Sequence, residues 1–141
     1  MARHVGILGL GIYLPPKKLT NLDLEKIVET SDEWIRSRTG IYERRIASSD
    51  EKTSDLAAAA AQSALADAAL APEDIDLIIV ATISPDSNFP AMACKVQKNI
   101  GAHKSTAFDI SAACSGFLYA LTTAKQYVLS GMVKNALVIA A

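Results

Sequence analysis

The sequence is short of the residues that mark several protein classes. Two of its 141 residues are cysteine, too few for a disulfide scaffold. Its two histidines show no metal-ligand spacing with each other or with the cysteines, so a zinc site is not expected. Basic and acidic residues nearly balance, 14 against 15. A nucleic-acid-binding protein that neutralises phosphates is therefore disfavoured.

Long apolar runs are also missing. No segment approaches the roughly 20 consecutive apolar residues that cross a bilayer. A basic start followed by the apolar run 5–14 mimics a signal peptide, but glycines interrupt the run. Two prolines and two lysines (15–18) then stand where a small-residue cleavage site would be. We therefore expect a cytoplasmic protein that does not contact a membrane.

The chain does contain enough apolar side chains to build a core. Half of its residues are apolar and 21% are charged, a composition that opposes intrinsic disorder. The length suits one domain. The final segment, 136–141, is a strand-like apolar run, whereas domains usually end in polar residues. We expect residues 1–141 to form one structural unit that is a piece of a longer protein.

Strand-like and helix-like segments alternate, which predicts a layered α/β fold with a parallel or mixed sheet. The run 77–83 is continuously apolar and β-branched, as is typical of a strand buried on both faces. One expected helix begins at a capping box, Thr30–Glu33, and ends at Gly40. The expected strands are 3–13, 77–83, 105–110 and 136–141. The expected helices are 21–29, 30–39, 53 to about 71, 90–100 and 115–129. In the last helix, Phe117, Leu121, Ala124 and Val128 are expected to share one face.

Cys114 is the residue that says most about chemistry. It lies between an expected strand and an expected helix, so its thiol would sit at a helix N-terminus, where free N–H groups stabilise a thiolate. Its neighbours from Ala112 to Gly116 are small and leave room for a substrate. This is the arrangement of a nucleophile elbow with sulfur in place of oxygen. The alternative, a small buried core cysteine, stays open at this point.

Two further features are better explained by packing. Cys94 lies in the middle of an expected helix, so a core position is favoured. Gly9 and Gly11 begin like a dinucleotide-binding fingerprint, but the third glycine is missing and Pro15-Pro16 stands where a helix should open. The two glycines are therefore expected to allow close packing of a strand. The alanine-rich helix that starts at 53 or 54 has a thin profile, which also allows close packing.

Trp34 and Arg38 are one helical turn apart and share a face. An aromatic surface beside a guanidinium suits a ligand that has a flat base and phosphates. From the pattern alone, however, the favoured interpretation is that Trp34 packs inward and the arginines are solvated. Phe89 precedes Pro90 in a polar loop, where it either meets a pocket or partner or staples the next helix.

Three blocks of the sequence, 9–15, 30–41 and 109–117, resemble the N-terminal part of bacterial β-ketoacyl-acyl carrier protein synthase III. The second block contains Thr-Ser-Asp-Glu-Trp and the third contains Ala-Ala-Cys-Ser-Gly-Phe. The resemblance implies a thiolase-like α-β-α-β-α fold, of which this chain is the first, incomplete half. It also implies an acyltransferase that initiates fatty acid synthesis by condensing a short acyl-CoA with malonyl-acyl carrier protein.

The same resemblance assigns roles to individual residues. Cys114 becomes the nucleophile that carries the acyl group. Thr30, Trp34 and Arg38 become coenzyme A-binding residues, with Trp34 stacked on the adenine. Phe89 becomes a residue of the acyl pocket across a homodimer. No metal or resident cofactor is implied, because coenzyme A enters as the substrate thioester.

The resemblance leaves a gap and two alternatives. The family completes its active site with a histidine and an asparagine from the second half, and neither has a counterpart here. One alternative is a related condensing enzyme of secondary metabolism that uses another acyl primer. The other is an inactive piece that folds only against its C-terminal half.

Overall fold

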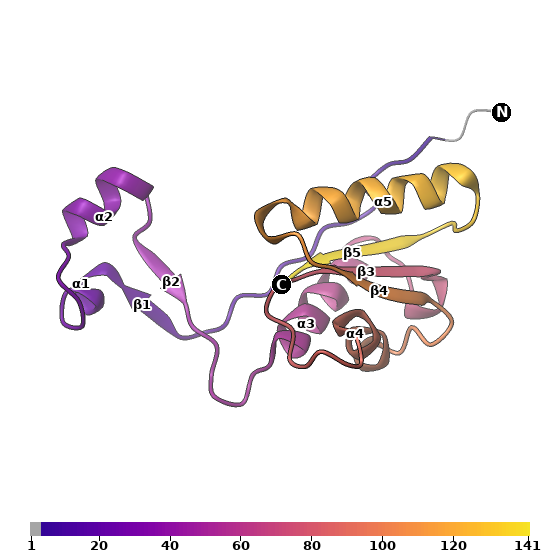
Figure 1. Ribbon diagram of the computed structural model, residues 1–141. Coiled ribbons are helices and arrows are strands. Elements are labelled where there is room, and N and C mark those ends of the chain that lie inside the picture. The colour runs from indigo at the N-terminus through magenta and orange to yellow at the C-terminus, as the bar shows by residue number, and fades with distance from the viewer. Residues whose placement is uncertain (1–3) are drawn as a thin grey trace. The chain divides into compact units, whose positions relative to one another are not determined.

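The structure, a computed structural model, describes residues 4–141 and divides them into two compact units (Figure 1). The larger unit comprises 4–13 and 52–141, and the smaller unit comprises 14–51. The sequence predicted a single unit. Each of the two units is described by itself below.

A parallel three-stranded sheet forms the centre of the larger unit. Its order is β4 (Thr106–Ile110), β3 (Leu77–Ala81), β5 (Ala136–Ala140), with Leu77 opposite Thr106 on one side and Ala136 on the other. Every residue of β3 is buried. The prediction of a strand buried on both faces is therefore confirmed, because β3 has a neighbour on each edge and helices on each face.

Helices cover both faces of this sheet and make a three-layer α/β/α arrangement (Figure 1). α3 (Thr53–Asp67) and α4 (Met92–Ile100) pack with Ile78 and Val80 of β3 on one face. α5 (Gly116–Ser130) packs with Leu77, Ile79 and Ala81 on the other. Of residues 4–141, no helix is both long and apolar enough to cross a membrane.

The buried face of α5 differs from the predicted one. Ala120 and Ala124 face the sheet, while Phe117 is 43% exposed and Leu121 is 37% exposed. α5 is apolar around most of its circumference, so the sequence pattern does not select a face. The small alanines allow the helix axis to approach the sheet closely, and of the large side chains of α5 Tyr127 packs against this core while Phe117 and Leu121 stay exposed.

The segment 4–13 is not the buried strand that the sequence predicted. It forms no strand in the structure, and Ile7, Leu10 and Ile12 are exposed. The segment forms no strand because it lies along helix α3 and not beside another strand. Its Leu10 N–H donates to a side chain of that helix, Asp67 Oδ2, at 2.9 Å. A helix offers no ladder of backbone partners. The expected strand began at residue 3, which lies outside the described residues.

Gly9 and Gly11 do pack closely, as expected, but against a helix. A Cβ at Gly9 would lie 2.6 Å from Ala68 N, and a Cβ at Gly11 would overlap Ala60 O and Ala64 N. The thin alanine surface of α3 and the two glycines thus let two backbones touch. This contact explains the glycine pair without a dinucleotide site.

The smaller unit pairs β1 (Lys18–Thr20) antiparallel with β2 (Glu43–Arg45) and adds α1 (Asn21–Leu24) and α2 (Asp32–Thr39). Helix 21–29 was thus predicted too long. The predicted Thr30 cap of the next helix is off by one residue. Ser31 has the extended backbone of an N-cap, and its Oγ accepts from Trp34 N at 3.1 Å. Gly40 ends α2 in the left-handed conformation, as predicted.

The start of α4 was also predicted two residues too early, at Pro90. The helix begins at Met92, and its first N–H groups are bound by a neighbouring strand. Asp109 of β4 accepts from Met92 N and from Ala93 N, each at 2.7 Å. A side chain remote in sequence therefore fixes where this helix begins.

Candidate active site

Cys114 lies on a tight turn between β4 and α5. The strand ends at Ile110, a 3₁₀ turn spans Ala113–Ser115, and α5 follows at Gly116. Ala113 has φ of 45°, a left-handed value that is uncommon for a residue with a Cβ. Cys114 itself is exposed. The predicted strand–turn–helix placement is confirmed, and the buried-core alternative for Cys114 is wrong.

The start of α5, next to this thiol, has no side-chain cap. Ser115, the N-cap, makes no side-chain hydrogen bond to the helix. N-terminal N–H groups of a helix attract negative charge, whether a thiolate or the oxygen of a reacting thioester. A Cβ at Gly116 would lie 3.2 Å from Ala81 Cβ, so this glycine lets the helix begin close to β3.

Phe89 projects from the loop that joins β3 to α4. Its exposed fraction is 89%, so it does not staple the following helix. The base of the loop is anchored to the start of α3, where Thr53 Oγ1 donates to Ser84 O at 3.0 Å and Ser54 N donates to Asp86 Oδ1 at 3.2 Å. An anchored loop thus presents a large apolar side chain to solvent.

In the smaller unit, Trp34 is 56% exposed, so the interpretation that it packs inward is wrong. Thr30 and Trp34 line one shallow pocket of about 260 Å³, together with Glu29 and Ser31. The guanidinium carbon of Arg38 lies 5.5 Å from the centre of the Trp34 ring. The structure therefore brings together the three residues that the resemblance assigned to coenzyme A, two in a pocket and one beside it.

The neighbouring arginines are engaged within the same unit. Arg36 lies over the Tyr42 ring at 4.4 Å and forms an ion pair with Asp32 at 3.3 Å. Hydrogen bonds to Tyr42 and Asp32 raise the pKa of Arg36. A hydrogen bond from the Asn21 amide, aided by Arg36, holds the pKa of Asp32 below its ordinary value. Arg38, by contrast, forms no salt bridge to any described residue.

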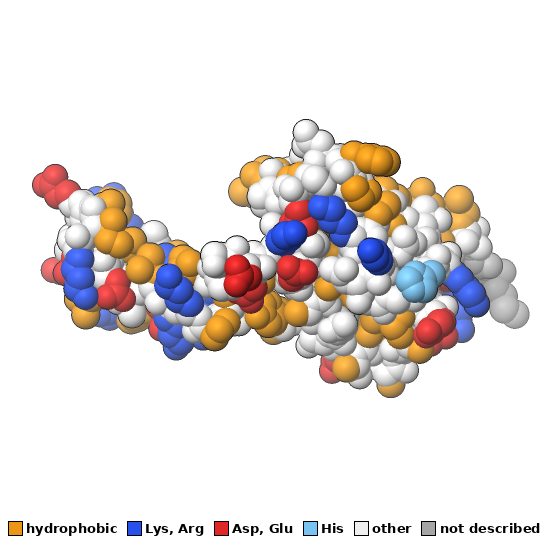
Figure 2. Space-filling model, turned by 90° about the horizontal axis from the view of Figure 1, so that it is seen from below, with side chains coloured by type: hydrophobic (Ala, Val, Ile, Leu, Met, Phe, Trp, Pro, Cys, Tyr) orange, Lys and Arg blue, Asp and Glu red, His pale blue; other side chains and the backbone are white. Residues whose placement is uncertain are grey.

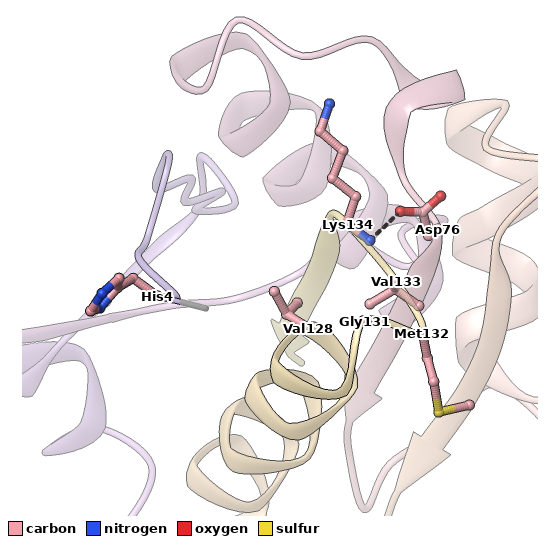
Figure 3. Close-up of a pocket in the computed structure, with 7 residues that line it drawn as sticks. All are labelled: His4, Asp76, Val128, Gly131, Met132, Val133 and Lys134. Atoms are coloured by element: carbon pink, nitrogen blue, oxygen red, sulfur yellow. Dashed lines mark hydrogen bonds between the residues drawn. The ribbon is translucent and has the colours of Figure 1, made fainter. Parts of the chain in front are cut away.

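A second hollow, of about 620 Å³, lies beside the turn that follows α5 (Figure 3). Asp76 there accepts from Lys134 N at 2.7 Å and from Asn135 N at 3.0 Å, and these bonds lower its pKa. The carboxylate thus closes a turn, and none of the predicted site residues lines this hollow. Over residues 4–141, no group of three His, Cys, Asp or Glu side chains is placed to hold a metal ion.

The predicted site residues fall into two groups. Cys114 and Phe89 belong to the larger unit, and Thr30, Trp34 and Arg38 belong to the smaller one. On the face that Figure 2 presents, acidic and basic side chains are interspersed. Sequence reasoning did not single out Asn21, whose amide binds Asp32, or Asp109, whose carboxylate binds α4. The sequence did offer one signal for Asp109, because this residue lies within the third block of the resemblance, 109–117.

Comparisons with known proteins agree with this geometry. A family model described as 3-oxoacyl-[acyl-carrier-protein] synthase III matches residues 108–141, which include the Cys114 turn. A β-ketoacyl-[acyl-carrier-protein] synthase III of Bacillus pumilus is 63% identical over 136 residues, 96% of this chain and 44% of the relative. The chain thus spans less than half the length of that relative.

Solved structures give the same picture. A 3-oxoacyl-[acyl-carrier-protein] synthase III from Aquifex aeolicus superposes with a TM-score of 0.93 at 57% identity, covering 96% of this chain and 44% of that one. The priming β-ketosynthase of a polyketide biosynthetic pathway gives 0.92 at 37% identity, with coverage of 95% and 40%. In sequence and in its thiolase-like α/β fold, the chain thus resembles the bacterial β-ketoacyl-acyl carrier protein synthase III proteins.

Proposed function

We propose that this chain is the N-terminal half of a β-ketoacyl-acyl carrier protein synthase III and carries its acylation chemistry. The observation that carries the proposal is the exposed thiol of Cys114, held on a left-handed turn where α5 begins. A thiolate is a strong nucleophile, and the helix start supplies N–H donors for the charge that develops on the substrate oxygen. The Cys114 N–H is one such donor.

The first step is a transfer of the acyl group. The Cys114 thiolate attacks the carbonyl carbon of an acyl-CoA, a new carbon–sulfur bond forms, and the bond to coenzyme A breaks. Coenzyme A leaves as the thiol with the proton that Cys114 gave up. In the second step malonyl-acyl carrier protein loses carbon dioxide, and its carbanion attacks the acyl thioester. The bond between the acyl carbon and the Cys114 sulfur breaks, and the products are 3-oxoacyl-acyl carrier protein and the Cys114 thiolate, which regains a proton from water.

The nucleotide end of coenzyme A is assigned to Thr30, Trp34 and Arg38. The exposed Trp34 ring offers a stacking surface for adenine, and the Arg38 guanidinium, which forms no salt bridge to a described residue, offers charge for a phosphate. Phe89 is assigned to the acyl pocket of the partner in a homodimer, since its exposed side chain needs an apolar cover. The proposed reaction takes place in the cytoplasm and calls for no resident cofactor.

The condensation step needs groups that stabilise the enolate left by decarboxylation. A histidine and an asparagine from the remaining part of the protein are proposed for this role. The isolated 1–141 chain is therefore expected to be acylated but not to condense.

Intact-mass measurement after incubation with acetyl-CoA tests the proposal. We expect one acetyl group on the chain, none on Cys114→Ala, and one on Cys94→Ala, whose half-buried thiol lies 3.8 Å from Ala107 O. Cys94→Ala is thus the matched control for loss of a thiol. Acetylation that persists in Cys114→Ala would contradict the assignment of Cys114 as the nucleophile. In the complete protein, Cys114→Ala must also abolish condensation.

A second candidate keeps the fold and changes the acyl primer. The similarity to a priming β-ketosynthase of a polyketide pathway favours this alternative. Relative rates of Cys114 acylation by acetyl-CoA, branched acyl-CoA and long-chain acyl-CoA distinguish the two. A clear preference for acetyl-CoA supports fatty acid initiation, and a preference for another acyl group supports the alternative.

A further inference from the structure

The smaller unit has almost no apolar core. Of residues 14–51, all of which the structure describes, only Pro15, Asn21 and Ile35 are buried, and Ile35 is the one buried residue of α2. Burial of apolar surface therefore contributes little to holding α2 in place. Polar contacts must fix the helix that carries Trp34 and Arg38.

Asn21 is the buried polar centre of this unit, with an exposed fraction of 1%. Its Nδ2 donates to Asp32 Oδ1 at 2.8 Å and to Ile41 O at 2.7 Å. Its Oδ1 accepts from an Nη of Arg44 at 2.8 Å. The backbone N–H of Asn21 donates to Tyr42 O at 3.2 Å. Both amide hydrogens and the amide oxygen of the side chain are thus in use.

The two groups that accept the amide hydrogens stand at opposite ends of α2. Asp32 is the first residue of the helix, and Ile41 follows Gly40, the left-handed residue that ends it. One side chain therefore binds both ends of an 8-residue helix. The first turn is held further by Glu25, whose Oε1 accepts from Asp32 N at 2.6 Å.

We propose that Asn21 is a positioning residue for nucleotide recognition, because it holds both ends of the helix that presents Trp34 and Arg38. The inference rests on the proposed function of those two side chains. Without the Asn21 amide, α2 samples other orientations, and only a fraction of the molecules can bind. The apparent affinity is the intrinsic affinity multiplied by that fraction. A helix that is correctly placed a tenth of the time therefore binds about tenfold more weakly.

Asn21→Asp is the sharpest variant. It keeps the size of the side chain and an oxygen for Arg44, but it replaces the donor that serves Asp32 and Ile41 with an acceptor. Adding Asp32→Asn restores a donor–acceptor pair at the contact between residues 21 and 32. Lys18→Ala is the matched control, since it removes an exposed ion pair to Glu43 (2.9 Å) in the same unit.

The main readout is the rate of Cys114 acetylation by acetyl-CoA divided by the rate with acetyl-pantetheine, which lacks the nucleotide. We expect Asn21→Asp to lower this ratio about tenfold and Lys18→Ala to keep it. The double variant should regain part of the ratio, because it restores the contact with residue 32 but not the one with Ile41 O. Unfolding of the whole chain would lower both rates and leave the ratio unchanged, whereas unfolding of the smaller unit alone would show as lost helical circular dichroism. The binding of adenosine 3′,5′-bisphosphate, followed by the fluorescence of the single tryptophan, Trp34, must weaken by the same factor.

An unchanged ratio in Asn21→Asp overturns the role of Asn21, and so does a double variant no better than the single one. Failure of the proposed function looks different. A wild-type chain that uses acetyl-pantetheine as well as acetyl-CoA contradicts the nucleotide site itself, whatever the Asn21 variants do.

Discussion

Arg38 lies over the Trp34 ring on α2, with the guanidinium carbon 5.5 Å from the ring centre. A cation over an aromatic face is attracted to the ring, so each side chain restricts the other. One helical turn therefore presents the charged guanidinium of Arg38 and the flat ring of Trp34 side by side. Because Trp34 is more exposed than buried, this pair can meet a ligand without unpacking the unit.

The first prediction concerns the Trp34 ring. Trp34→Ala should weaken the binding of acetyl-CoA about 5- to 150-fold, since stacking of a base on an aromatic side chain contributes roughly 1–3 kcal/mol. Isothermal titration calorimetry in a Cys114→Ala background, in which acetyl-CoA binds without acetylating the chain, gives the dissociation constant. Leu22→Ala is the control, because Leu22 is a comparably exposed apolar residue of the same unit. Equal affinities of the wild type and Trp34→Ala would contradict the adenine assignment.

The second prediction concerns the left-handed residue beside the nucleophile. Ala113→Gly removes the steric cost of its φ of 45° but loosens the turn. Stability should change by no more than about 1 kcal/mol, while Cys114 acylation slows about tenfold because the thiol is less well oriented. Ala69→Gly is the control, since Ala69 also has positive φ (51°) but lies away from Cys114 in the chain.

Thermal unfolding and acylation rates of the two glycine variants separate the effects. Ala69→Gly should leave the acylation rate unaltered. Acylation at the wild-type rate in Ala113→Gly would show that the left-handed turn does not orient the thiol.

The third prediction concerns the contact of segment 4–13 with α3. Gly11→Ala should destabilise the fold by about 1–3 kcal/mol, because the new Cβ would overlap Ala60 O and Ala64 N. Gly6→Ala should be nearly neutral, since nothing lies within 4 Å of its Cβ position. Chemical denaturation measures both free energies of unfolding. Similar values for the two variants would exclude the close packing of Gly11 on α3.

How far the fold follows from sequence is clearest in the contrast between β3 and 4–13. Both are apolar and strand-like, and only β3 is a strand. The run at 77–81 is rich in β-branched residues, whereas 4–13 contains glycines that fit a helix backbone. The element against which an apolar segment packs depends on the tertiary structure. The local sequence pattern therefore shows that the segment is apolar, but it does not predict which element the segment packs against.

The candidate site shows the same division. The turn around Cys114 and the shared face of Trp34 and Arg38 follow from local spacing, and the structure has both. The contacts of Asn21 do not, because its partners lie 11 and 20 positions away. The exposure of Trp34 does not follow from spacing either, since it depends on what packs against α2. Ser31 and Thr30 can each cap a helix chemically, and the backbone conformation decides between them.

The fourth prediction concerns pH. Hydrogen bonds from Thr20, then from Lys26, lower the pKa of Asp23 to about 2 from 3.8. A carboxyl with a depressed pKa stabilises the folded state above its unfolded pKa, and that contribution disappears as the pH falls through the folded value. Thr20→Val should raise the pKa of Asp23, as followed by NMR of its carboxyl carbon. The stability difference from wild type should shrink as the pH falls from about 4 to about 2.

Lys26→Ala provides the comparison, because its contribution is second to that of Thr20. The pKa of Asp23 should rise less in this variant than in Thr20→Val. The reverse order would mean that the charge of Lys26, at 3.0 Å, outweighs the hydroxyl of Thr20, at 2.7 Å.

The last prediction concerns Asp109, which links the strand before Cys114 to the helix after the Phe89 loop. Its two oxygens accept from Met92 N and Ala93 N, each at 2.7 Å, and Asn can accept with one oxygen only. Asp109→Asn should therefore cost about 1–3 kcal/mol of stability, measured by chemical denaturation. Because β4 leads into the Cys114 turn, acylation of Cys114 should also slow in this variant.

Asp76→Asn is the control for this change, because Asp76 also accepts two consecutive N–H groups, at 2.7 and 3.0 Å, but with a single oxygen, Oδ2, that an amide oxygen can replace. It lies at the turn before β5, in a hollow that no predicted site residue lines. We expect Asp76→Asn to lose less stability than Asp109→Asn, and only Asp109→Asn to lose acylation rate at a temperature where each stays folded. Equal acylation by the two variants would mean that Asp109 caps α4 without placing the thiol.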